Sequence, residues 1–286
     1  MNCLLMYSHQ SGHKSFVTQI PYVKERLLAR FDRVDFVSTS SKEEATQVIL
    51  DCASKYDVLV IVGGDGTFNN AINSLKDVQP KPILGYINYG TIGDIGRNFG
   101  IGSGLKRSID ILVNGEIASF DVGEINGELF AYVCTIGRYS DIAYLTPRKK
   151  KRVLGKIAYY NAAIKELGDK KMVHASIDAD GGHYEIDTPF LLVLNGINIG
   201  GFKVNRFASI QDGKMELFMA KCDFSNGVLP LLANKDRVVL RAREFFIKTD
   251  EQMGWCLDGE EGPKGEAHII THPGMFKIIA KKNFVK

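Results

Sequence analysis

The sequence predicts an α/β protein with an N-terminal doubly wound parallel sheet domain followed by a mainly antiparallel β-sandwich domain. In the first part of the chain, short apolar runs alternate with segments of helical periodicity, which is typical of a parallel sheet covered by helices. In the second part, strand-like runs follow one another at short spacing with polar turns between them, which is typical of a sandwich. We expect the two domains to span residues 1–118 and 119–286.

The composition argues against several classes of protein. The 286 residues carry a formal net charge of +3 at pH 7, which is too mild to indicate a nucleic-acid partner, and none is expected. The five cysteines are dispersed without a CxxC pair, which favours reduced thiols and a cytoplasmic location. We expect no signal peptide, and no apolar run approaches the ~18 residues that span a bilayer.

Three strand–helix units in a row build the predicted parallel sheet. Their strands are expected at residues 2–7, 33–37 and 57–62, and a fourth strand is expected at 82–87. Ser41 and Glu44 predict a capping box at the start of the second helix. In such a sheet, ligands bind beyond the carboxyl ends of the strands. A functional site is therefore expected in the loops that follow the strands.

The pentapeptide GGDGT at residues 63–67 is the strongest functional signal in the chain. It follows a strand rich in valine and isoleucine and precedes a helix, for which Thr67 is the predicted N-cap. A strand, a glycine turn and a helix N-terminus direct free backbone N–H groups towards an anion. Asp65 within this turn would repel a phosphate unless a cation lay between them, so the loop predicts a nucleotide phosphate chain with Mg²⁺. The alternative is a tight turn in which the Asp is incidental.

A second glycine-rich loop follows the fourth strand, at residues 88–94. Its polar members are Thr91 and Asp94. Taken alone, it is equally well explained as a plain loop with turn glycines. Because both loops follow strands of one parallel sheet, we expect them to converge at one edge of that sheet.

Strand-like runs dominate the second part of the chain, and one helix is expected at residues 153–167. The runs are at residues 120–125, 130–136, 173–177, 190–194, 215–220, 238–247, 255–257, 267–270 and 276–280. Five consecutive basic residues, Arg148–Arg152, form either a solvated loop or a contact with anionic lipid headgroups. Arg237, Arg241 and Arg243 would extend such a basic patch.

Taken together in chain order, the motifs resemble those of the diacylglycerol kinase-like lipid kinases, and the resemblance covers most of the chain. An isolated Asp-Gly between strands is most often a hairpin turn, but combined with GGDGT the Asp258-Gly259-Glu260 segment resembles the family's second signature. The matching segments are Ser11-Gly12, the GGDGTxN of Gly63–Asn69, Gly90-Thr91 with Asp94, the DxGxxNGxxF of Asp121–Phe130, Leu154-Gly155-Lys156, Asn195 with Gly200-Gly201, Asp212-Gly213 and Asp258-Gly259-Glu260.

The resemblance implies an ATP-dependent lipid kinase that transfers the γ-phosphate to the hydroxyl of a diacylglycerol-like lipid. Asp65 would hold or orient Mg²⁺, together with Asp258, and Glu260 would take the proton from the acceptor hydroxyl. The residues expected to bind ATP are Gly63, Gly64, Asp65, Gly66, Thr67, Phe68, Asn69 and Thr91, with Ser11, Gly12 and Thr39. The resemblance also implies a structural metal bound by the side chain of Asp212 and, we infer, the carbonyls of Ser209 and Lys214.

The same resemblance implies a cytoplasmic protein of phospholipid biosynthesis that works peripherally at the membrane surface, and it is compatible with a homodimer. Several positions depart from the family pattern: Gly93 and Tyr132 each replace an Asn, Asn70 replaces a Glu, and Gln211 replaces the first Asp of a DDG motif. These departures bear on nucleotide affinity and substrate identity more than on the fold.

Three alternatives stay open at this point. Residues 84–93 also resemble the LGINxGTxG loop of NAD kinases. A catalytically inactive nucleotide- or lipid-binding homologue is the second alternative. A kinase for another lipid, such as a sphingoid base, is the third.

Overall fold

The computed structural model describes residues 1–8, 14–90, 93–102, 104–137, 172–199, 202–205, 208–220, 237–250 and 252–282. The chain forms two compact units, the first made of Met1–Phe120 with Gly274–Lys286 and the second of Asp121–Pro273. Within the described part of the chain, no helix is both long and apolar enough to cross a membrane. The predicted helix at 153–167 and the Arg148–Arg152 run lie outside the described residues.

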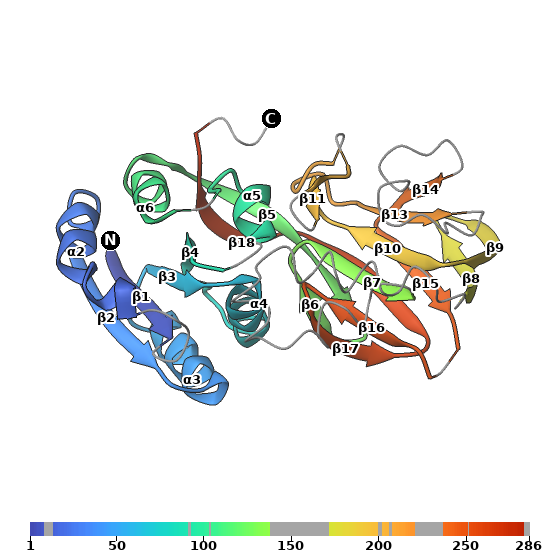
Figure 1. Ribbon diagram of the computed structural model, residues 1–286, viewed down its shortest axis with the longest axis horizontal. Helices are drawn as coiled ribbons and strands as arrows, with labels where there is room; N and C mark the ends of the chain where they lie inside the picture. Colours follow the sequence, from blue (N-terminus) through green and yellow to red (C-terminus); the bar gives the residue numbers. More distant parts are fainter. Residues whose placement is uncertain are drawn as a thin grey trace. The chain divides into compact units, whose positions relative to one another are not determined.

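The first unit is a parallel sheet with helices on both faces (Figure 1). The strand order is β2-β1-β3-β4, and the end of β18 pairs in parallel with β4. Helices α2 and α6 pack together, as do α3 and α4. The strands are β1 (Asn2–Ser8), β2 (Arg33–Thr39), β3 (Val58–Gly63) and β4 (Ile83–Asn88), and the helices are α1 (Lys14–Val17), α2 (Ile20–Leu27), α3 (Lys42–Ala53), α4 (Asp65–Ser74), α5 (Asp94–Asn98) and α6 (Leu105–Asn114).

Two helix starts in this unit test the predicted caps. At α3, Ser41 Oγ accepts from Glu44 N at 3.1 Å, as a capping box requires. The Glu44 carboxylate accepts from Ser40 N at 2.7 Å, so the second hydrogen bond of the box comes from the residue before Ser41. At α4, the N-cap is Gly64, and Thr67 N–H already donates to Gly64 O at 3.0 Å. The prediction of Thr67 as N-cap is therefore wrong, because the helix begins at Asp65, within the pentapeptide.

The second unit is an antiparallel sandwich, which confirms the predicted fold class. One sheet has the order β14-β13-β10-β7-β16-β17, and the other contains β18-β15-β8-β9. One apolar core takes side chains from both sheets, and the fully buried Trp255 is its largest member. The strands are β5 (Glu116–Ile125), β6 (Glu128–Phe130), β7 (Val133–Gly137), β8 (Val173–Ala179), β9 (Gly182–Thr188), β10 (Phe190–Leu194), β11 (Asn198–Ile199), β12 (Phe202–Lys203), β13 (Met215–Ala220), β14 (Arg237–Ala242), β15 (Glu244–Lys248), β16 (Gly254–Leu257), β17 (Glu260–Lys264) and β18 (Ala267–Ala280).

The end of the chain belongs to the first unit. The predicted second domain of 119–286 therefore extends too far, because the unit stops at Pro273. The cause is β18, a single strand of which one part pairs with β15 and the other, at Ile278, pairs with β4. Phe276 on its second half stacks on Phe120 with 5.8 Å between ring centroids, within the first unit.

Candidate functional site

The GGDGT loop passes from β3 into α4 through glycines in very close contact with other atoms. A Cβ on Gly63 would lie 2.6 Å from Thr67 Oγ1, and a Cβ on Gly90 would lie 2.7 Å from the Cα of Gly64. Both distances are shorter than van der Waals contact, so a side chain at either position would push the loops apart. The N-cap of α4 makes no side-chain hydrogen bond, which leaves the first N–H groups of the helix available to an anion.

The two glycine loops converge, as the sequence predicts. Gly63 pairs with Asn88 at the ends of β3 and β4. The Asp65 carboxylate accepts from the backbone N–H groups of Asp94 and Ile95, each at 3.3 Å, at the start of α5. Asp65 therefore ties the first loop to the second, a structural task that the sequence did not reveal.

Two carboxylates and a buried phenol lie at this edge of the sheet. The side chain of Asp94 is fully buried, and its Oδ1 pairs with Arg97 Nη1 at 3.0 Å. Burial, and then the charges of Asp65 and Asp94, raise the pKa of Tyr86 well above its usual value. Its hydroxyl therefore stays protonated and donates to Gly63 O at 3.1 Å. Carboxylate oxygens beside a helix N-terminus suit a divalent cation that accompanies a phosphate chain.

Asn88 is the organising side chain of the second loop. It is 4% exposed, its Oδ1 accepts from Gly90 N at 3.1 Å, and its Nδ2 donates to Gly102 O at 2.9 Å and Gly93 O at 3.4 Å. Gly93 has φ +66°, and a Cβ there would lie 1.9 Å from Asn88 Nδ2. The space that a side chain of residue 93 would fill is thus taken by the Asn88 amide. Sequence reasoning missed Asn88, and its only signal was a polar residue at the end of an apolar run.

The other predicted nucleotide contacts have mixed outcomes. Thr39 ends β2 at the carboxyl edge of the sheet and is buried. Phe68 is fully buried against the Tyr86 ring, 5.3 Å away, so its ring cannot contact a nucleotide, and that prediction is wrong for the side chain. Asn69 Oδ1 accepts a hydrogen bond from Asn73 Nδ2, one turn later in α4, at 3.1 Å. The predicted contacts Ser11, Gly12 and Thr91 lie outside the described residues.

In the second unit, Asp258 is the first residue of the turn between β16 and β17, and Glu260 follows the turn. Asp258 has φ +52° and Gly259 has φ +90°, as a two-residue hairpin turn requires. The Asp258 carboxylate is buried and accepts from three consecutive backbone N–H groups, of residues 131, 132 and 133, at 2.6, 3.0 and 3.0 Å. These bonds turn it into the protein, so the arrangement does not support the predicted Mg²⁺ role of Asp258. Glu260 is exposed as the first residue of β17.

Other family-like motifs also come together in the second unit. Asp121 Oδ2 accepts from Gly213 N at 2.7 Å, and Asn195 Nδ2 donates to Asp121 O at 2.6 Å. Gly123 makes room for the Phe130 ring, whose Cζ would lie 2.1 Å from a Cβ on Gly123. Residues separated by more than 70 positions in the sequence thus contact one another, and their role is to fix this part of the fold.

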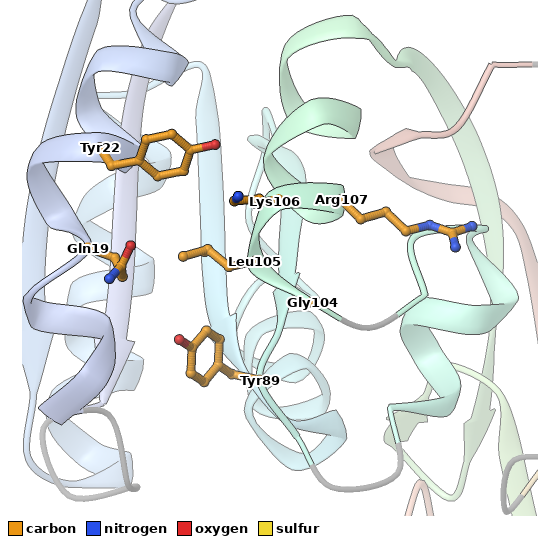
Figure 2. A pocket seen from close by; sticks show the side chains of 7 residues that line it. All are labelled: Gln19, Tyr22, Tyr89, Gly104, Leu105, Lys106 and Arg107. Atoms are coloured by element: carbon orange, nitrogen blue, oxygen red, sulfur yellow. The ribbon is translucent and has the colours of Figure 1, made fainter.

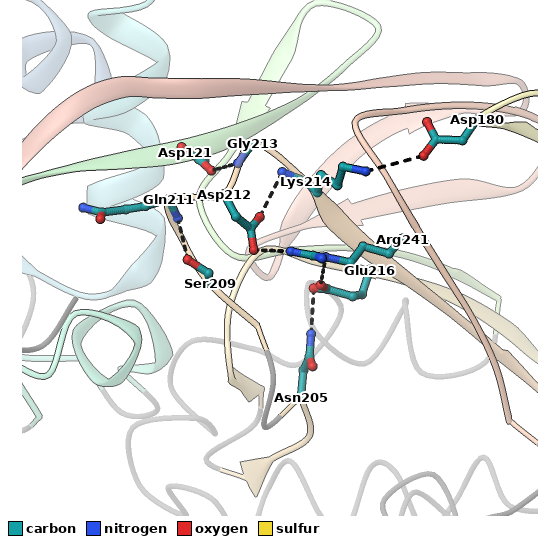
Figure 3. A network of polar contacts seen from close by, with 10 residues as sticks. All are labelled: Asp121, Asp180, Asn205, Ser209, Gln211, Asp212, Gly213, Lys214, Glu216 and Arg241. Atoms are coloured by element: carbon teal, nitrogen blue, oxygen red, sulfur yellow. Dashed lines mark hydrogen bonds and ion pairs between the residues drawn. The ribbon is translucent and has the colours of Figure 1, made fainter. Parts of the chain in front are cut away.

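The predicted ligands of a structural metal occupy the segment before β13. Ser209 Oγ accepts from Gln211 N at 3.2 Å, and Asp212 Oδ1 accepts from Lys214 N at 3.1 Å. The other oxygen of Asp212 accepts from the guanidinium of Arg241, as Figure 3 shows. The structure therefore brings a cationic side chain to the carboxylate that was expected to bind a metal.

The first unit also contains a cavity of about 540 Å³ between α2 and the start of α6 (Figure 2). Tyr22, Tyr89 and Leu105 face this cavity, whereas Arg107 points away from it. The sequence did not predict this cavity, because its lining residues come from segments that are far apart in the chain. The lining residues are Gln19, Tyr22, Tyr89, Gly104, Leu105, Lys106 and Arg107.

Comparison with known proteins finds similar sequences and structures. Residues 2–125 match the diacylglycerol kinase catalytic domain. The chain is 29% identical to a diacylglycerol kinase of Staphylococcus saprophyticus subsp. saprophyticus, with 93% of this chain and 91% of the relative covered. It is 27% identical to a diacylglycerol kinase of Bacillus subtilis (strain 168), with coverage of 90% and 89%.

Solved structures agree with the sequence relatives. A crystal structure of a diacylglycerol kinase from Bacillus anthracis str. Sterne superposes with a TM-score of 0.84 at 25% identity, covering 99% of this chain and 98% of that one. The match thus includes both units, the first with its converging glycine loops and the second with its antiparallel sheets. The chain thus resembles diacylglycerol kinases in sequence and in fold along most of its length.

Proposed function

We propose that this protein is an ATP-dependent kinase that transfers the γ-phosphate of ATP to the hydroxyl of a diacylglycerol-like lipid. The observation that supports this most is the convergence of the two glycine loops, where Asp65 binds the start of α5 beside the N-terminus of α4, which has no side-chain cap. Such an edge suits a triphosphate chain with a divalent cation. The names of the relatives support a lipid alcohol as acceptor.

In this proposal, the backbone N–H groups of residues 64–66 bind the phosphates of ATP, and Thr91 adds a hydroxyl from the second loop. Asp65 would hold the metal, since its carboxylate lies where the two loops converge. Magnesium, when bound, neutralises charge on the phosphate oxygens. Because Asp65 also anchors α5, its replacement should disturb the loop as well as the metal.

Glu260 is the proposed general base. It takes the proton of the lipid hydroxyl as that oxygen forms a bond to the γ-phosphorus, while the bond from the γ-phosphorus to the β–γ bridging oxygen breaks and ADP leaves with the electron pair. The exposure of Glu260 suits contact with a substrate. Asp258 acts as a positioning residue, because its three hydrogen bonds fix the turn that presents Glu260.

The lipid acceptor places the reaction at a membrane surface. We propose that the protein works peripherally and that Arg148–Arg152 contact anionic headgroups, where each basic residue contributes about 1 kcal/mol. Arg241 does not extend this patch in the way the sequence suggests, since its guanidinium is paired with Asp212 and Glu216.

A substrate panel tests the proposed function. The protein is incubated with γ-labelled ATP, Mg²⁺ and mixed micelles that contain diacylglycerol, a sphingoid base or no lipid, and in parallel with NAD. Label in the diacylglycerol product supports the proposal. Label in the sphingoid base or in NAD would assign one of the alternative kinases, and no label in any acceptor would indicate an inactive homologue.

A further inference from the structure

The segment that the family resemblance assigns to a structural metal already contains a cation of its own. The two oxygens of Asp212 have different partners: Oδ2 pairs with Arg241 Nη2, and Oδ1 accepts from Lys214 N at 3.1 Å (Figure 3). Asp212 is the only predicted ligand that was to contribute a side chain. Its carboxylate is therefore engaged from both sides.

Arg241 is held in place by a second carboxylate. Its Nε pairs with Glu216 Oε1 at 3.1 Å, and Glu216 Oε2 accepts from Asn205 Nδ2 at 2.7 Å. The Glu216 side chain is 9% exposed. Glu216 and Arg241 are also direct partners in the pairing of β13 with β14, so the strand register aligns the guanidinium with this carboxylate. Arg241 thus bridges the turn at Asp212 to the sheet.

These residues do not fit a divalent metal. A metal ion on Asp212 would lie next to the guanidinium, and two cations that share one carboxylate repel each other. Gln211, which stands where the family has an acidic residue, removes a negative charge from the same turn.

The turn is held by other protein contacts as well. Gly213 N donates to Asp121 Oδ2 at 2.7 Å, and Lys214 Nζ lies 3.8 Å from Asp180 Oδ2. Each of these bonds ties the turn to a different strand or hairpin of the second unit. Contacts within the protein therefore hold this turn in place without a metal ion.

We propose that the guanidinium of Arg241 performs the task of the structural metal, so that the second unit folds and stays stable without a divalent ion. This inference rests on residues of the second unit and does not depend on the proposed function. The inference concerns only the structural metal. The Mg²⁺ that would accompany ATP at the glycine loops is a separate ion and is unaffected by it.

The first test is made on the wild-type protein without nucleotide. We expect less than about 0.1 equivalent of divalent metal after gel filtration in metal-free buffer, and a melting temperature that changes by less than about 1 °C with EDTA or with millimolar Mg²⁺ or Ca²⁺. A tightly bound metal near one equivalent, or a melting temperature that EDTA lowers and Mg²⁺ restores, would overturn the proposal.

The second test replaces the cation. Arg241→Gln removes the guanidinium that pairs with Asp212 and Glu216, and we expect the melting temperature to fall by about 3–8 °C. Arg243→Gln, an exposed arginine just beyond the same strand, is the matched control and should change it by less than about 1 °C. Equal melting temperatures for the two variants would contradict the role of Arg241.

A third variant converts the turn towards metal binding. Gln211→Asp with Arg241→Gln restores the acidic residue and removes the guanidinium. We expect millimolar Mg²⁺ or Ca²⁺ to raise the melting temperature of this double variant by several degrees more than that of wild type. If Arg241→Gln does not fold, the metal content and EDTA response of the wild type still decide the question.

Discussion

Gly93→Ala is the sharpest perturbation that the candidate nucleotide site offers. The new Cβ would lie 1.9 Å from Asn88 Nδ2, so the amide must move away from its hydrogen bonds to Gly90 N and Gly102 O. A left-handed φ of +66° costs an alanine about 1 kcal/mol, and each lost hydrogen bond of a buried amide costs about 1 kcal/mol more. We expect a loss of about 3–4 kcal/mol in unfolding free energy of the first unit.

Gly102→Ala is the matched control. Gly102 has φ +67°, but the nearest atoms to a Cβ there belong to the flexible end of Arg107, at 3.3 Å. This variant should therefore lose only about 1 kcal/mol. Urea titration followed by circular dichroism measures both losses, and calorimetry with ATP should show weaker binding for Gly93→Ala alone.

A double-mutant cycle isolates the clash with Asn88. In the background of Asn88→Ala the obstructing amide is gone, so Gly93→Ala should then lose only about 1 kcal/mol. An equal loss of stability in both backgrounds would refute the conclusion that Asn88 occupies the side-chain space of residue 93.

Three further predictions concern other parts of the molecule. Asp258→Asn weakens three hydrogen bonds to a buried carboxylate, so it should lower the unfolding free energy by about 2–3 kcal/mol, and raising Mg²⁺ should not rescue it in urea titrations. Hydrogen bonds to Asp187 and Asp178 raise the pKa values of His174 and His183 in the folded protein. The two histidines therefore stabilise the fold fully below a pH of about 6.5, and this contribution is lost as pH rises through their folded pKa values. The melting temperature of a His174→Gln/His183→Gln variant should match that of wild type at pH ~9 and fall below it at pH ~5.5. Binding to anionic vesicles should weaken as salt rises past about 0.1 M and weaken further when Arg148–Arg152 are neutralised, whereas salt-independent binding to neutral vesicles would indicate an apolar insertion surface.

Local patterns in the sequence predict the elements and the loops well. The apolar run of β3 and the glycines after it are enough to locate a strand, a turn and a helix N-terminus, because each depends on neighbours in the chain. The convergence of the two loops also follows, since parallel strands place their carboxyl ends at one edge. The fold class could therefore be predicted before any contact was known.

Long-range partners could not be predicted in the same way. Asn88 and Gly102 are 14 residues apart, and Asp212 and Arg241 are 29 residues apart, with no periodicity that links them. The hydrogen bonds of Asp258 could not be predicted for the same reason, because its donors lie 125 to 127 residues earlier in the chain. The sequence separates the two runs of β18, but it does not show that the second run pairs with β4 in the first unit.

The most direct test of the proposed function compares Glu260→Gln with Glu261→Gln in the lipid kinase assay. The two residues are neighbours on β17 and both are exposed, so general effects of charge and strand stability are matched. If Glu260 is the base, turnover of γ-labelled ATP with diacylglycerol should fall by about 10²–10⁴-fold in Glu260→Gln, with ATP affinity nearly unchanged, while Glu261→Gln stays within a few-fold of wild type. Wild-type turnover in Glu260→Gln, or an equal loss in both variants, would contradict the proposed mechanism.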